Sequence, residues 1–346
     1  MQFYIKQHNF YCGIDLHTNN MYLCILGQDG KIVLHKNIRT SPDTFLHAIK
    51  PYRDNLVICV ECMFTWYWLA DLCEREHIHF VLGHALYMRA IHGGKSKNDK
   101  LDSHKIAALL RGGLIPMAYP YPQKMRATRD LMRRRNHLMR KRAELLAHIQ
   151  NTASQYNLPP LGKITLAKNR LDILDHFDDP AVQLSVAANL DMITTYDQVL
   201  AVLEREIIIC AKEHDSTAYA LLRTIPGVGR IIALILLYEI GDISRFPQVQ
   251  NFASYCRLVK CAKESNGKKY GAGGGKMGNA HLRWAFAEAA QLFLRGNHPG
   301  HRYFTKISNK HGKGKALSIL AHKLGRSVYF ILKNRQGFDM NRFLSV

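Results

Sequence analysis

Short apolar runs separated by turn residues open the chain. Residues 11–15, 20–27 and 31–38 have the length and composition of strands, and Asp29-Gly30 marks the turn between the last two. The wholly apolar run at 56–60 predicts a strand buried on both faces, and 78–82 predicts a fifth strand. Between and after these runs the pattern predicts helices over 42–50, 64–76, 84–91 and 102–112. The order predicts a mixed sheet with helices on its faces.

The pattern changes after the proline-rich stretch 116–123, which is typical of a linker. From Lys124 onward, Leu131, Leu138 and Leu145 repeat every seven residues and predict one long helix, which Pro159-Pro160 ends. A second long helix is expected over 181–213. Two long helices around a loop predict an antiparallel coiled-coil arm or a dimerisation element.

The C-terminal part is predicted to be mainly helical. Two helices flank the sequence Pro226-Gly227-Val228-Gly229, which is typical of a helix-hairpin-helix element. A glycine-rich, basic loop is expected over 263–283. Further helices are predicted at 249–258, 279–295, 298–310 and 313–333. We therefore expect three domains, at 1–122, 123–215 and 216–346.

Charge narrows the possible partners of this chain. Its 346 residues include 48 Lys and Arg against 27 Asp and Glu, a formal net charge of +21. Such an excess favours nucleic acid or an anionic membrane surface as partner. No apolar run approaches the length needed to span a bilayer, and the N-terminus lacks the apolar core of a signal peptide. We therefore expect a cytoplasmic protein without a membrane partner.

Four carboxylates occupy positions that favour a metal site. Asp15 and Glu61 each end a predicted core strand, where ligands bind in open α/β sheets. Asp99 and Asp102 lie three residues apart, on one face of a helix start. If the four converge, their repulsion calls for divalent cations, and oxygen donors suit Mg²⁺ or Mn²⁺. Each acid also has a simpler interpretation, with Asp99 as a helix cap, Asp102 in a first turn, Asp15 in a turn and Glu61 as a helix N-terminal charge.

Basic residues cover much of the first long helix. A solvated coiled-coil face usually mixes charge signs, but here only Asp130 and Glu144 oppose the run. Contact with phosphates is therefore the favoured interpretation, ahead of a membrane surface, because the apolar stripe is narrow and lacks aromatic residues. The residues concerned are Arg129, Arg133, Arg134, Arg135, Arg140, Lys141 and Arg142.

Two glycine-containing segments are further candidates for phosphate contact. Gly227 and Gly229 permit positive φ and leave backbone N–H groups open, although a tight helix–helix corner needs the same residues. In the basic loop, glycines lie among Lys268, Lys269 and Lys276, around the single hydroxyl of Ser265. Locally, Ser265 fits a loop cap as well as a nucleophile toward phosphorus.

In this order the motifs resemble a known family. The N-terminal motifs are GIDLH with Asp15, VEC with Glu61, and KNDKLDSHKIA with Asp99 and Asp102. The C-terminal motifs are TIPGVG, EIGDISRF and the block KESNGKKYG…GKMGNAHLRWAFAEAA. Together they resemble the DEDD transposases of the Piv/MooV invertase type, the bridge-RNA-guided recombinases of bacterial insertion sequences. The resemblance spans nearly the whole chain.

The resemblance implies a RuvC-like (ribonuclease H-fold) N-terminal domain with Asp15, Glu61, Asp99 and Asp102 as its metal-binding tetrad. It implies a C-terminal transposase domain whose serine nucleophile corresponds best to Ser265, although the family often has Ser-Gly there and this chain has Asn266 between. A covalent serine–DNA intermediate would form at a composite site on double-stranded DNA, at element ends and target. A structured noncoding guide RNA and a dimer or tetramer are also implied. The alternatives are a RuvC-like nuclease that resolves branched DNA by water attack, and a non-catalytic nucleic-acid-binding protein.

Overall fold

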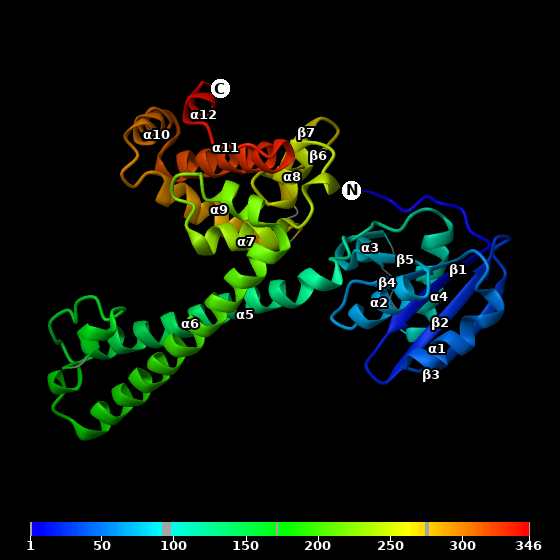
Figure 1. The fold of residues 1–346 in the computed structure, drawn as a ribbon, viewed down its shortest axis with the longest axis horizontal. Coiled ribbons are helices and arrows are strands. Elements are labelled where there is room, and N and C mark those ends of the chain that lie inside the picture. Colours follow the sequence, from blue (N-terminus) through cyan, green and yellow to red (C-terminus); the bar gives the residue numbers. More distant parts are fainter. Residues whose placement is uncertain (1, 92–97, 171, 274–276, 346) are drawn as a thin grey trace. The chain divides into compact units, whose positions relative to one another are not determined.

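The chain forms two compact units, Met1–Gln123 and Lys124–Val346, each with its own hydrophobic core. This computed structural model describes residues 2–91, 98–170, 172–273 and 277–345 (Figure 1). Within those ranges, no helix is both long enough and apolar enough to cross a membrane.

A five-stranded mixed sheet forms the centre of the N-terminal unit (Figure 1), in the order β3-β2-β1-β4-β5. The first three strands pair antiparallel, whereas β4 lies parallel to both β1 and β5. The predicted mixed sheet is therefore confirmed. The strands are β1 (Phe10–Leu16), β2 (Asn20–Gly27), β3 (Ile32–Arg39), β4 (Leu56–Glu61) and β5 (His79–Gly83).

Helices cover both faces of this sheet. Side chains alternate along β4, so that Ile58 packs with the cluster that includes Phe45 and Leu69, while Val57 packs with the cluster that includes Ile106. Burial on both faces explains why β4 is wholly apolar up to Glu61. The helices are α1 (Pro42–Ile49), α2 (Tyr67–Arg75), α3 (Ala85–Ile91) and α4 (Asp99–Arg111), with the 3₁₀ turn η1 (Lys50–Tyr52) after α1.

A glycine lets α4 lie directly on β1. A Cβ built on Gly13 would come within 2.2 Å of the Ala107 nitrogen and 2.4 Å of the Ser103 carbonyl oxygen. No other residue type allows this approach without movement of the helix or strand. The N-terminus of α4 is thereby brought to the end of β1 where Asp15 lies.

The C-terminal unit begins with two long helices that run antiparallel, α5 (Gln123–Gln155) and α6 (Pro180–Leu222) (Figure 1). Ion pairs join Arg135 to Glu204 and Arg142 to Asp197, so that residues advancing along α5 meet residues receding along α6. The segment between the helices packs Ile173 and Phe177 against them and contains η2 (Ala167–Arg170) and η3 (Leu174–His176). Asp215 interrupts α6 with non-helical φ and ψ.

The remainder of the unit is mostly helical, as predicted. Its core surrounds α7, of which every residue from Ile232 to Ile240 is buried. The elements are α7 (Arg230–Ile240), η4 (Ile243–Arg245), α8 (Val249–Tyr255), β6 (Cys261–Ser265), β7 (Lys268–Gly273), α9 (Ala280–Phe293), α10 (His298–His311), α11 (Lys313–Asn334) and α12 (Met340–Leu344).

One local expectation and one alternative interpretation were wrong. The segment expected as a loop over 263–283 contains the antiparallel hairpin β6–β7 instead, because Asn266 and Gly267 both take positive φ, at 49° and 70°, and close a two-residue turn. The cap of α4 is Asn98, whose side-chain oxygen accepts from the Lys100 N–H at 2.9 Å, rather than Asp99, which is the first helical residue. The carboxylate of Asp99 therefore is not needed as a cap.

Candidate metal centre and nucleic-acid interface

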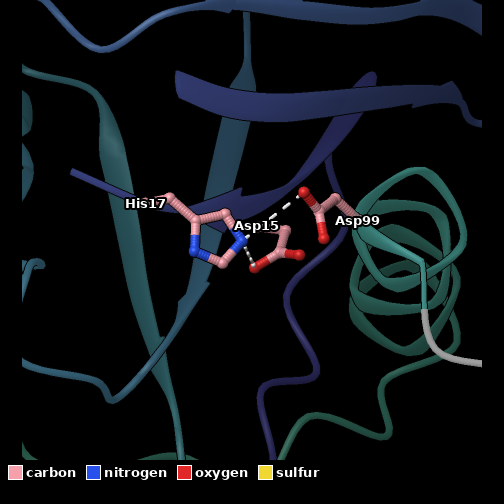
Figure 2. A group of neighbouring side chains, drawn as sticks. All are labelled: Asp15, His17 and Asp99. Carbon is pink, nitrogen blue, oxygen red and sulfur yellow. Dashed lines mark ion pairs between the residues drawn. The ribbon is translucent and has the colours of Figure 1, made fainter. Parts of the chain in front are cut away.

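Asp15 and Asp99 come together at the end of β1, with His17 between them (Figure 2). The His17 Nε2 lies 3.4 Å from Asp15 Oδ1 and 3.7 Å from Asp99 Oδ2. One donor atom from each of these three residues lies within 4.8 Å of the other two. Asp15 and His17, at the end of β1, thus converge with Asp99, which begins α4 far along the sequence.

The other two predicted carboxylates lie close by but outside this group of three. Ile14 pairs with Val60 in the parallel β1–β4 ladder, so Asp15 and Glu61 are the next residues along neighbouring strands. Glu61 is half-buried at the end of β4. Asp102 forms an ion pair with Lys105, with 3.2 Å between its Oδ1 and the lysine Nζ.

The environment of Asp15 opposes its ionisation. Burial raises the pKa of the Asp15 carboxyl, the neighbouring His17 lowers this pKa, and the charges of Asp99 and Asp102 raise it further. The pKa is raised on balance. A positive charge among these carboxylates would offset the cost of burying the ionised Asp15 and would reduce the repulsion between the carboxylates.

His17 was missed as a site residue in the sequence. The signal that could have found it is the i, i+2 spacing from Asp15, which places both side chains on the same side of an extended strand. The backbone holds the residue firmly, since its N–H donates to the Asn20 carbonyl at 3.1 Å and its carbonyl accepts from the Thr40 hydroxyl at 3.0 Å.

In the C-terminal unit, five of the seven basic residues expected to meet phosphates have an acidic partner in the chain. Arg129 and Arg133 both contact Glu239 of α7, at 3.0 and 2.7 Å. The remaining pairs are Arg135 with Glu204, Lys141 with Glu144, and Arg142 with Asp197. Most of these carboxylates lie on other helices, so the run of like charge along α5 is neutralised from outside the helix.

Arg134 and Arg140 differ from their neighbours. Both are exposed, and neither forms an ion pair with any residue that the structure describes. They remain available for phosphates, whereas Arg129, Arg135 and Arg142 expose only 11, 11 and 12% of their side chains.

Glu239 also connects α5 to the residue that follows the glycine-rich segment. Its Oε2 accepts a hydrogen bond from Asn279 Nδ2 at 2.8 Å. Asn279 in turn caps α9, because its Oδ1 accepts from the backbone N–H groups of His281 and Leu282. Burial would raise the Glu239 pKa, but the hydrogen bond from Arg133 and the charges of Arg129 and Arg133 lower it to about 2.

Ser265 is exposed at the end of β6, directly before the Asn266-Gly267 turn, and pairs with Lys268 across the hairpin. Lys268 is exposed as well. Lys269 belongs to β7, while Lys276 lies outside the described residues.

The two glycines of the Pro226–Gly229 turn have different surroundings. A Cβ on Gly227, whose φ is +81°, would lie 2.3 Å from the Phe293 nitrogen, so this glycine is needed for packing on α9. A Cβ on Gly229 would meet nothing within 4 Å. Gly229 precedes α7 without a side-chain cap, and Arg223 and Arg295 line the same shallow concavity of about 490 Å³.

Comparison with known families matches both units of the chain. Residues 12–158 match a family described as Transposase, whose profile is that of the DEDD transposases of the IS110 type. Residues 219–305 match the family described as Transposase IS116/IS110/IS902 family. The first match contains Asp15, Glu61, Asp99 and Asp102, and the second contains Ser265.

Relatives of nearly full length carry transposase names. The transposase for insertion sequence element IS1111A of Coxiella burnetii is 19% identical, over 94% of this chain and 90% of the relative. The transposase for insertion sequence element IS1328 of Yersinia enterocolitica is 23% identical, over 92% and 95%. The pilin gene-inverting protein of Moraxella bovis is 31% identical over 39% of this chain and 42% of its own length. The chain therefore belongs to the IS110-type DEDD transposases, and it is a DNA-binding enzyme of DNA transposition and recombination.

Proposed function

We propose that this transposase cuts and rejoins DNA at a composite site made of a RuvC-like metal centre and a serine nucleophile. The N-terminal metal centre would consist of Asp15, Glu61, Asp99 and Asp102. The observation that carries this proposal is the meeting of Asp15 and Asp99 at one sheet edge, beside the end of β4. An antiparallel three-stranded meander continued by two parallel strands supports a ribonuclease H-type fold for residues 1–122.

The donors present fit a divalent cation. Carboxylate oxygens are the ligands that Mg²⁺ and Mn²⁺ prefer, and here they converge from two elements, with Asp15 half-buried and Asp99 exposed. When bound, such an ion would polarise the scissile phosphate. The carboxylates themselves would orient the phosphodiester by holding the ion, and Lys105 would keep Asp102 in place.

Ser265 is the proposed nucleophile, in a C-terminal domain that we place at 216–346. Its oxygen would form a bond to phosphorus while the bond from phosphorus to a deoxyribose oxygen breaks, and the leaving oxygen would take up a proton. A deoxyribose hydroxyl of the recipient strand would then attack the serine phosphodiester and release the serine. The exposed position of Ser265 beside a tight turn supports this role, since a DNA strand must reach it.

DNA and a structured guide RNA are the proposed nucleic-acid partners. Phosphate contacts would come from the exposed residues Arg134, Arg140 and Lys268. Lys269 and Lys276 belong to the same basic segment as Ser265. A helix-hairpin-helix contact would come from Gly227 and Gly229. A +21 charge suits two polyanions, with base pairing to the RNA choosing the sequence. We further propose a dimer or tetramer, with the coiled-coil arm of residues 123–215 as a contact, acting on DNA in the bacterial cytoplasm.

The decisive test replaces Ser265 by Ala in cells that carry the complete element with its flanking noncoding ends. We expect recombination and the detergent-resistant protein–DNA adduct to disappear, and Asp15→Asn to abolish both as well. Ser254→Ala, a change of an exposed serine on α8, serves as the matched control and should retain both. Strand cleavage that persists in Ser265→Ala would instead favour a nuclease that uses water, and full activity of Asp15→Asn would contradict the metal centre.

The guide RNA is tested separately by blocking transcription of the noncoding ends, with their DNA left in place, and supplying their transcript in trans. Recombination should stop when transcription is blocked and return with the transcript. Recombination that continues without any such RNA would contradict this part of the proposal and leave the serine mechanism untouched.

A further inference from the structure

We propose that His17 is a nitrogen ligand of the metal centre, so that the site is a mixed carboxylate–imidazole site. The inference rests on the proposed function, in which Asp15 and Asp99 hold a divalent ion. Its own basis is the position of the His17 Nε2, which bridges both carboxylates at 3.4 and 3.7 Å.

These separations suit ligands that share one ion. In octahedral coordination with metal–ligand bonds of about 2.1 Å, neighbouring donor atoms lie about 3 Å apart. The Nε2 lies 3.4 Å from the Asp15 oxygen and 3.7 Å from the Asp99 oxygen, so both side chains have to draw in by less than about 1 Å to share one ion. In Figure 2 the other ring nitrogen faces away from both carboxylates, which leaves Nε2 as the ligating atom.

The backbone prepares His17 for this role. Its backbone hydrogen bonds connect His17 to Asn20 at the start of β2 and to Thr40 just after β3. Thr40 in turn donates its backbone N–H to the Asn19 carbonyl at 2.9 Å. With the backbone held on both sides, binding a metal needs only side-chain adjustment. The His17 side chain is 56% exposed, so a metal ion can reach it from solvent.

A nitrogen ligand changes which metal the centre prefers. Mg²⁺ and Ca²⁺ are hard cations that favour oxygen, whereas imidazole favours later transition metals, and Mn²⁺ tolerates both. The proposed site should therefore discriminate between Mn²⁺ and Mg²⁺ more strongly than four carboxylates alone. This preference depends on one residue and can be removed with it.

The experiment loads the full chain with less than one equivalent of Mn²⁺ and records electron spin echo envelope modulation. We expect modulation from a directly bound nitrogen in the unaltered protein and its loss in His17→Gln. The Mn²⁺ dissociation constant should rise by at least about tenfold, the lower end of the cost of losing even an outer partner of a metal site, with a smaller rise for Mg²⁺. His47→Gln, a change of an exposed histidine on α1, is the matched control and should retain the nitrogen signal and the affinity.

The outcomes separate this inference from the proposed function. Absence of nitrogen modulation in the unaltered protein, or its persistence in His17→Gln, overturns the role of His17 while Asp15→Asn still abolishes Mn²⁺ binding. If Asp15→Asn binds Mn²⁺ as well as the unaltered protein does, the carboxylate centre itself is refuted. Circular dichroism of each variant, unchanged from the parent, shows that the loss of the signal is not loss of the fold.

Discussion

Arg133 holds Glu239 through two parallel hydrogen bonds, from Nε to Oε1 at 2.7 Å and from Nη2 to Oε2 at 3.0 Å. Arg129 adds a third bond to the same carboxylate, which exposes only 2% of its side chain. This network joins α5 to α7 and, through Asn279, to the start of α9. Part of the positive charge of α5 is therefore paired within the fold.

Removing Glu239 should destabilise the C-terminal unit strongly. Glu239→Ala leaves the largely buried Arg129 and the half-buried Arg133 without their shared carboxylate, and breaking a buried pair from one side costs about 3–5 kcal/mol. Urea unfolding followed by circular dichroism measures the loss. Glu144→Ala breaks the exposed pair with Lys141 and should change stability by less than about 1 kcal/mol. Equal effects of the two substitutions would contradict the importance of burial.

The Glu239 carboxylate should make the free energy of unfolding depend on pH in the acidic range. Its pKa is about 2 in the folded chain and 4.5 for an unperturbed glutamate, so the unfolded state binds the proton more readily. The stabilisation is thus complete above pH 4.5 and is lost as pH falls toward 2; the shift corresponds to about 3 kcal/mol. Unfolding free energies measured from pH 6 to pH 3 should fall less steeply in Glu239→Gln. Parallel pH profiles for the two proteins would refute the assignment.

Among the predicted phosphate-binding arginines of α5, the exposed Arg134 and Arg140 should contribute directly to phosphate binding. Arg134→Ala and Arg140→Ala should each weaken DNA binding and reduce the slope of log affinity against log salt by about 1. Fluorescence anisotropy titrations at several salt concentrations provide both numbers. Arg135→Ala and Arg142→Ala remove ion pairs to α6 and should instead lower the unfolding midpoint. A reduced salt slope in Arg142→Ala, with unchanged stability, would show that this pair opens to bind DNA.

Substitution by alanine should lower the stability of the fold at Gly227 but leave it unchanged at Gly229, the two glycines of the Pro226–Gly229 turn. Gly227→Ala forces a Cβ into the backbone of α9 at a left-handed φ, and overpacking together with backbone strain should cost more than about 3 kcal/mol. Gly229→Ala has open space around its Cβ and should fold normally, so it isolates any effect on DNA binding. Thermal unfolding and anisotropy of both variants make the comparison. Normal folding of Gly227→Ala would mean that the turn does not pack on α9 as described.

The sequence alone determined the elements that depend on local periodicity. The short apolar runs of β1 to β3, the apolar run of β4 and the seven-residue stripe of α5 were readable from the sequence, because local composition and side-chain repeat follow the backbone conformation. The sequence also placed Asp15 and Glu61 at the ends of two core strands, and the parallel β1–β4 ladder makes those two ends neighbours. The β6–β7 hairpin was missed because its flanking residues are glycines and lysines, although Asn266-Gly267 is a strong turn signal.

Only the tertiary structure decided which charges meet. Gly13 brings α4 onto β1, and through that approach Asp99 joins Asp15 and His17. Likewise Glu239 reaches Arg133 over a separation of 106 residues, which no local pattern along α5 reveals. Charge pairing depends on distances of a few ångströms between segments remote in sequence, and those distances are set by how whole elements pack.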